Sequence, residues 1–172
     1  MVGMVKMKVA GIALDPASNA PIVILQDKHG NTLPIWVGMM EAASIGAAME
    51  GISYARPMTH DLFSSMLKAL DARVLRIGIV DIRENVFYAE ITIAYKDGQI
   101  SIDARPSDAI AIALRQGAEI FASKDVIDDV AQHPDNGHPG RKTPVIGFEQ
   151  DEDKLKKILE NMSPEDFGKF KA

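Results

Sequence analysis

The stretch SIDARPSDAIAIALRQG, residues 101–117, joins a strand pattern to a helix pattern and decides how the second half of the chain folds. Apolar and polar residues alternate before the proline, which predicts a strand with Asp103 and Arg105 on one face. The proline stops the extended run because it cannot donate to a sheet ladder. A helix follows, where Ser107 suits the N-cap and Asp108 lies where the helix dipole favours an anion. Two carboxylates and an arginine are thus expected at one strand-to-helix corner.

A similar corner occurs earlier in the chain, in ARPMTHDLFSSMLKAL, residues 55–70. Arg56 and a proline precede His60 and Asp61, which stand at the start of a helix predicted over 60–70. That helix carries a wide apolar stripe, which is typical of a helix packed against a core. The echo between the two corners is too short to indicate an internal repeat.

The chain up to residue 131 alternates between strand and helix patterns and predicts one α+β domain. Short segments of alternating polarity joined by tight turns predict a largely antiparallel or mixed β-sheet with packed helices. The helix expected at 39–50 is rich in small side chains, which implies close packing. In chain order the predicted elements are strands at 4–14, 21–26 and 32–37, helices at 39–50 and 60–70, strands at 73–82, 86–95 and 99–105, a helix at 107–116, a strand at 118–123 and a helix at 124–131.

The sequence changes character after residue 131. Residues 132–147 are rich in proline and glycine and have no apolar period, so a linker is predicted there. Residues 148–172 carry apolar residues at helical spacing and predict a short helical tail. Two short helices cannot bury a core by themselves, so we expect the tail to dock on the domain or on another subunit.

Composition and charge restrict the class of protein. The absence of cysteine excludes disulfides, zinc–thiolate sites and cysteine nucleophiles, and it is compatible with a reducing compartment. No apolar run approaches the ~18 residues of a membrane span, and the first residues alternate like a strand rather than like a signal peptide. We therefore expect a cytoplasmic protein with no membrane partner. The net charge of -5 disfavours broad electrostatic contact with DNA or RNA, although a local positive face or a metal would offset it.

Four motifs resemble the bifunctional nuclease family: LPIWVGMMEAASI, RPMTHDLFSSML, VFYAEI and IDARPSDAIAIALR. They follow one another in the family's order, and the resemblance covers roughly residues 5–131. It implies a compact α+β domain that forms homo-oligomers. It also implies a nuclease, because plant relatives are described as degrading both DNA and RNA. The resemblance says more about the fold than about the chemistry, since function depends on a site.

The two corners carry side chains that a phosphodiesterase needs. Hydrolysis of a phosphodiester requires an activated water and stabilised phosphate oxygens, and it often uses a hard cation held by carboxylates. A histidine acts as general acid or base near neutral pH. The catalytic candidates are His60, Asp61, Asp103, Arg105 and Asp108.

Binding roles are assigned to some of the same residues. Asp103 and Asp108, with Asp61 beside them, are candidate ligands for Mg²⁺ or Mn²⁺, and no organic cofactor is expected. Arg56 and Arg105 are candidates for holding a substrate phosphate. The secondary acidic candidates are Glu41 and Glu90.

The same side chains also fit a purely structural role. Asp103 and Arg105 are two residues apart on one predicted strand face, so an ion pair between them would pin the corner. For His60, packing or capping in the first helical turn is the simpler role. This reading predicts a noncatalytic homo-oligomeric module that binds an anionic ligand or a protein partner.

Self-association, most simply as a dimer, is expected from side chains that suit an interface. Trp36 is the single tryptophan, and it fits a sheet edge or an interface better than a base-stacking surface, because aromatic residues are few. Several methionines suit a core or a subunit contact, namely Met39, Met40, Met49, Met58 and Met66.

Overall fold

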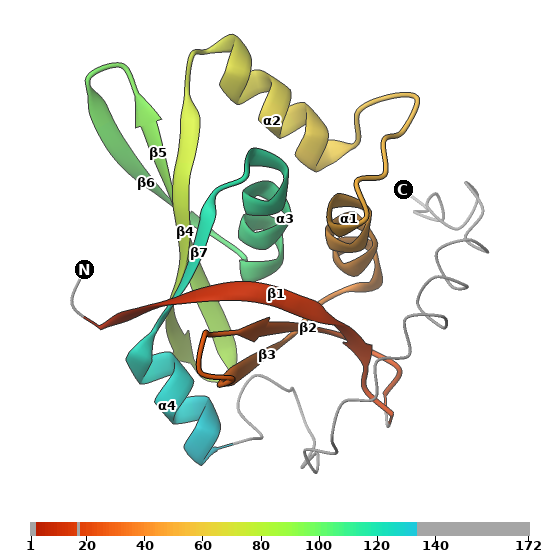
Figure 1. The fold of residues 1–172 in the computed structure, drawn as a ribbon, viewed down its shortest axis with the longest axis vertical. Coiled ribbons are helices and arrows are strands. Elements are labelled where there is room, and N and C mark those ends of the chain that lie inside the picture. The colour runs from red at the N-terminus through yellow and green to blue at the C-terminus, as the bar shows by residue number, and fades with distance from the viewer. Residues whose placement is uncertain (1–2, 17, 134–172) are drawn as a thin grey trace.

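Seven strands form one mixed sheet in a computed structural model of the chain, which describes residues 3–16 and 18–133 (Figure 1). The predicted α+β class is confirmed, and the bounds of every predicted helix and strand agree to within one residue. The strands are β1 (Met4–Leu14), β2 (Pro21–Gln26), β3 (Thr32–Trp36), β4 (Arg73–Arg83), β5 (Val86–Tyr95), β6 (Gly98–Ala104) and β7 (Glu119–Ser123). The helices are α1 (Met39–Met49), α2 (Thr59–Ala69), α3 (Pro106–Gln116) and α4 (Lys124–Gln132).

The sheet consists of two antiparallel meanders joined by β7. Its strand order is β3-β2-β1-β7-β4-β5-β6. Strand β7 runs antiparallel to β1 and parallel to β4, and it therefore has the same direction as β6. Parallel strands require a crossover connection, and α3 is that connection between β6 and β7. The corner quoted at the outset thus lies at the entrance to the crossover helix.

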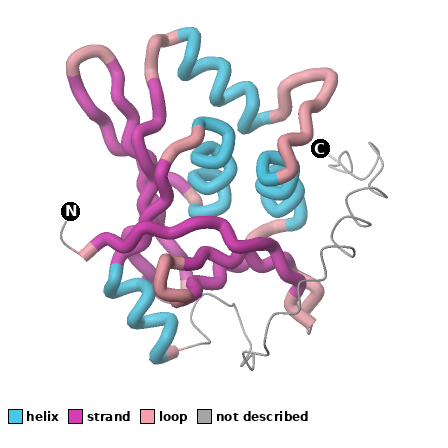
Figure 2. Tube along the Cα trace, in the orientation of Figure 1, coloured by secondary structure: helices cyan, strands magenta, loops and turns pink. Residues whose placement is uncertain are grey.

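Helix α3 is the centre of the helical layer. It contacts α1, α2 and the strands β4, β5 and β7, and most of its residues are buried. Figure 1 and Figure 2 show α1 and α3 side by side, with α2 above α3 and α4 below β1. The predicted close packing of α1 is confirmed, because Ala43, Gly46 and Ala47 are buried and their small side chains allow α3 to approach. Helices α1 and α2 therefore both pack against α3.

The two Arg-Pro corners have different structures. Helix α3 begins at its proline with Arg105 as the N-cap residue, so the N-cap role predicted for Ser107 is wrong. Proline suits the first helical position, because its fixed φ is helical and its missing N–H would have no partner there. Helix α2 begins two residues after its proline, at Thr59, with Met58 as the N-cap residue. The Met58 N–H donates to Asp61 Oδ2 over 3.0 Å.

Several other predictions are decided by burial and position. Trp36 ends β3, one of the two edge strands, as predicted for a sheet-edge residue. The five methionines between residues 39 and 66 are 40–56% exposed, so a core role for them is wrong, and a subunit contact stays a prediction.

No helix in the described ranges is long and apolar enough to cross a membrane. The tail predicted over 148–172, and the linker over 132–147 beyond its first two residues, lie outside the described residues.

Candidate active site

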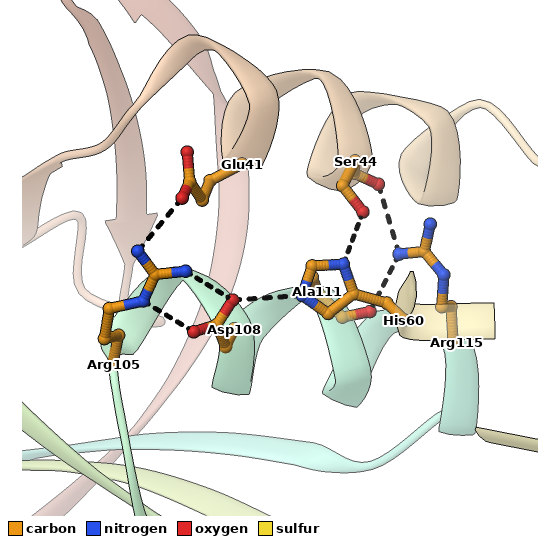
Figure 3. Close-up of polar contacts among 7 residues, drawn as sticks. All are labelled: Glu41, Ser44, His60, Arg105, Asp108, Ala111 and Arg115. Atoms are coloured by element: carbon orange, nitrogen blue, oxygen red, sulfur yellow. Dashed lines mark hydrogen bonds and ion pairs between the residues drawn. The ribbon is translucent and has the colours of Figure 1, made fainter. Parts of the chain in front are cut away.

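A continuous row of polar contacts runs along the packing of α1 against α3 (Figure 3). Arg105 Nη1 lies 3.0 Å from Glu41 Oε1, and Arg105 Nε and Nη2 donate to the two oxygens of Asp108 over 2.7 and 3.1 Å. Asp108 Oδ1 is also 3.1 Å from His60 Nε2. His60 Nδ1 is 2.8 Å from Ser44 Oγ. These five residues are called the polar row below.

The members of the polar row lie near the N-terminal ends of three helices. Glu41 and Ser44 are three residues apart in the first part of α1, so their side chains share one face of that helix. Asp108 lies in the first turn of α3 and is three residues from the N-cap Arg105. His60 is the second residue of α2. The row therefore needs all three helices, and α3 supplies its middle.

The charge of Asp108 fixes the direction of the hydrogen bonds. Burial raises the pKa of the Asp108 carboxyl, but hydrogen bonds from Arg105 and His60 outweigh burial, and the pKa lies below its ordinary value of 3.8. An ionised carboxylate only accepts hydrogen bonds, so His60 Nε2 carries the hydrogen and donates the hydrogen bond to Asp108. In the neutral imidazole, Nδ1 is then the acceptor, and the Ser44 hydroxyl donates to it.

A second ion pair ties the other end of α3 to α1 and α2. Arg115 Nε donates to Asp61 Oδ1 over 2.6 Å, and Arg115 Nη1 donates to the main-chain oxygens of Ser44 and Ala111 over 3.1 and 3.0 Å. The Arg115 side chain is only 10% exposed. Its hydrogen bond is the main cause that holds the pKa of the Asp61 carboxyl below its ordinary value. Arg115 thus lies beside Ser44 on the side away from Arg105 (Figure 3).

Two hollows border Arg115. The smaller has a volume of about 40 Å³, which is enough to hold water. Its lining residues are Met40, Ala43, Ser44, Tyr54, Met58 and Arg115. The larger, of about 290 Å³, lies between the second half of α1, the following loop and α3, where Ser53, Asp61 and Arg115 line it. Ser44 and the Arg115 guanidinium therefore line the same small hollow.

The structure joins some of the predicted site residues and separates others. His60, Arg105 and Asp108 lie together, and the secondary candidate Glu41 joins them. Asp61 is one step removed, because it contacts Arg115 instead.

Asp103 stands apart from the polar row. It is exposed on β6, opposite the exposed Glu90 of β5, and it forms no hydrogen bond or ion pair with the described residues. The predicted pairing of Asp103 with Arg105 is therefore wrong. Strand β6 ends at Ala104, and Arg105 turns with the helix toward Asp108.

Arg56 lies in the exposed loop between α1 and α2. It forms no ion pair with a carboxylate of the described residues, whereas Tyr54 and Met58 of the same loop line the smaller hollow. Arg56 is thus not part of the polar row, and it does not line the hollow.

Ser44 and Arg115 are members of the site that sequence reasoning missed. Arg115 follows Asp108 by two helical turns, so the helix predicted over 107–116 already placed both on one face. Ser44 follows Glu41 by one turn in the helix predicted over 39–50. Helical spacing from an acidic candidate would have found both.

The predicted metal site does not assemble from these side chains. Within residues 3–16 and 18–133, no three His, Asp or Glu side chains are grouped so as to hold a metal ion. Both oxygens of Asp108 accept hydrogen bonds from Arg105, and Asp61 is paired with Arg115. Asp103 and Asp108 therefore do not form a shared Mg²⁺ or Mn²⁺ site in this arrangement, and binding of a metal ion elsewhere stays an untested prediction.

Comparisons with known proteins identify the family. The family model of the bifunctional nuclease domain matches residues 23–135, which include the whole polar row. An uncharacterized protein of Mycobacterium tuberculosis is 36% identical over 166 residues, which are 95% of this chain and 98% of that protein. Bifunctional nucleases 2 and 1 of Arabidopsis thaliana are 28% and 31% identical over 131 and 115 residues, and these matches cover 40% and 35% of the plant proteins. As its four motifs predicted, the chain belongs to the bifunctional nuclease domain family.

Proposed function

We propose that the protein is a nuclease that hydrolyses phosphodiester bonds of DNA and RNA at the polar row. The observation that carries this proposal is the position of His60, which is hydrogen-bonded to Asp108 through Nε2 and to Ser44 through Nδ1. Ser44 in turn lines a hollow that the Arg115 guanidinium also lines. The names of the plant relatives support nucleic acid as the substrate class. We also propose, from the sequence, that the protein is cytoplasmic.

Each charged residue of the site then has a distinct role. His60 is the general acid or base, because it is the titratable group in contact with a hydroxyl at the hollow. Arg115 lines the hollow and faces the substrate phosphate, and Arg56 in the neighbouring loop contacts a more distant phosphate. Arg105 is already paired with Glu41 and Asp108, so we assign it to positioning Asp108 rather than to binding substrate.

A noncatalytic module is the second candidate function. The observation that favours it is that Arg105 and Arg115 both pair with carboxylates and thereby tie three helices together. In that case the polar row stabilises the fold, and an anionic ligand or a protein partner binds elsewhere.

A nuclease assay with purified protein separates the two functions. Short single-stranded DNA and RNA are incubated with wild type, His60→Ala and His29→Ala, with EDTA or with added Mg²⁺ or Mn²⁺, beside a mock purification. His29 lies exposed in the β2–β3 turn and serves as the matched control. We expect His60→Ala to lose at least about a hundred-fold in rate and His29→Ala to match wild type. Wild-type hydrolysis no greater than that of the mock purification would refute the nuclease and leave the module.

A further inference from the structure

We propose that Ser44 is the nucleophile of the reaction, with His60 as its base and Asp108 as the residue that positions the base. This inference rests on the proposed phosphodiesterase function and goes beyond it by naming the attacking atom, Ser44 Oγ. It also makes the chemical step independent of a bound metal ion.

The three side chains satisfy the geometry of an activated serine. A nucleophile must lie within hydrogen-bond reach of a base, and the base must be oriented by a third group. Ser44 Oγ lies 2.8 Å from His60 Nδ1, and His60 Nε2 lies 3.1 Å from Asp108 Oδ1. The His60 side chain is 13% exposed and that of Asp108 is 29% exposed, so the chain of hydrogen bonds is largely shielded from water.

The direction of the hydrogen bonds also favours the reaction. Asp108 accepts two hydrogen bonds from Arg105, which fixes the orientation of the carboxylate. The carboxylate in turn accepts a hydrogen bond from His60 Nε2–H, which leaves the Nδ1 lone pair directed at the Ser44 hydroxyl. Arg105 and Asp108 therefore act through His60, as positioning residues, whereas Ser44 and His60 themselves exchange the proton of the reaction.

The neighbourhood of Ser44 suits a phosphoryl group. Ser44 and Arg115 line the same small hollow, whose other walls are apolar side chains and Tyr54. Arg115 Nε and Nη1 have protein partners, whereas no hydrogen bond of Nη2 to a described residue is found. A guanidinium in a hollow with largely apolar walls stabilises the charge that develops on phosphate oxygens. Asp61 keeps this guanidinium in place.

The reaction proceeds in two steps, in which atoms and protons are conserved. Ser44 Oγ attacks phosphorus, its proton passes to His60 Nδ1, and the bond from phosphorus to the leaving sugar oxygen breaks. His60 gives this proton to the leaving oxygen, and a phosphodiester between Ser44 and the remaining strand is left. Water then attacks phosphorus, gives a proton to His60, and breaks the bond to Ser44 Oγ, which recovers the proton. The net reaction adds one water across the substrate phosphodiester.

Diisopropyl fluorophosphate is a direct probe of the proposed nucleophile. An activated Ser44 attacks its phosphorus, fluoride leaves, and one diisopropylphosphoryl group stays on Oγ, which peptide mass spectrometry locates. We expect labelling of wild type at Ser44, at least about a hundred-fold slower labelling in His60→Ala, and none in Ser44→Ala. Ser65→Ala is the matched control, because Ser65 is an exposed helix serine that donates only to the Asp61 main-chain oxygen.

Hydrolysis of single-stranded DNA and RNA in EDTA gives the second readout. We expect Ser44→Ala to lose at least about a thousand-fold in rate while Ser65→Ala keeps the wild-type rate. Full activity of Ser44→Ala, or labelling confined to other residues, would overturn the inference and leave the nuclease proposal intact. Labelling at Ser44 without any nuclease activity would refute the proposed function and support the nucleophile. Should Ser44→Ala not fold, absence of label on wild-type Ser44 overturns the inference by itself.

Discussion

Replacing Asp61 by asparagine tests how much the ion pair with Arg115 stabilises the helical layer. Asparagine keeps the shape of the side chain and one acceptor oxygen, which serves the Met58 N–H, so the change removes the charge and the hydrogen bond from Arg115 Nε. Breaking a fully buried pair costs about 3–5 kcal/mol. Here the Arg115 side chain is 10% exposed and that of Asp61 33%, so solvent screens the lost charge in part. We therefore expect a loss of about 2 kcal/mol in the free energy of unfolding.

The expected loss converts into a measurable change of the thermal midpoint. About 130 described residues, at about 2.1 cal/mol/K each, give a fall of about 7 °C in Tm. Circular dichroism during heating and urea denaturation measure the two quantities. Asp81→Asn is the matched control, because Asp81 also pairs with an arginine and a main-chain N–H, but at the surface. The Tm of the Asp81→Asn variant is expected to equal that of the wild type.

The difference between Asp61→Asn and wild type should also depend on pH. The pKa of Asp61 in the folded protein lies below 3.8, chiefly because of the hydrogen bond from Arg115. Its stabilisation is therefore present in full above 3.8 and is lost as the pH falls through the lower, folded-state pKa. A midpoint equal to that of wild type at pH 7, or a difference that does not shrink in acid, would refute the reasoning.

Two further predictions concern the exposed surface. Asp103→Asn is expected to leave Tm unchanged or raise it, because Asp103 and Glu90 are exposed like charges on opposing strands, and a fall of more than about 3 °C would contradict this. We also expect the protein to self-associate through the apolar side chains exposed on α2, where Met66 is 56% exposed, so Met66→Glu should lower the light-scattering mass. Val86→Glu, at an equally exposed position of the β4–β5 hairpin, should keep the mass, and a monomeric wild type at micromolar concentration would exclude the contact.

Local patterns in the sequence were sufficient for the helices and strands. Alternation of polarity, turn residues and helical spacing act over a few neighbouring residues, so the bounds of the elements followed from them. The strand-to-helix corner was predicted for the same reason, including Asp108 in the first turn of α3. The motifs that carried the family resemblance were also local, and the family follows from them.

Tertiary packing alone decided which side chains meet. The sequence did not place β7 between the two meanders, because strand order depends on contacts between distant segments. Ser44 and His60 are 16 residues apart, and His60 and Asp108 are 48 apart, so no local pattern joins them. Asp103, two residues from Arg105, shared a predicted face with it and yet makes no contact, because the strand ends at Ala104. The residue types of the site were readable in the chain, but their partners depended on how α1 and α2 pack against α3.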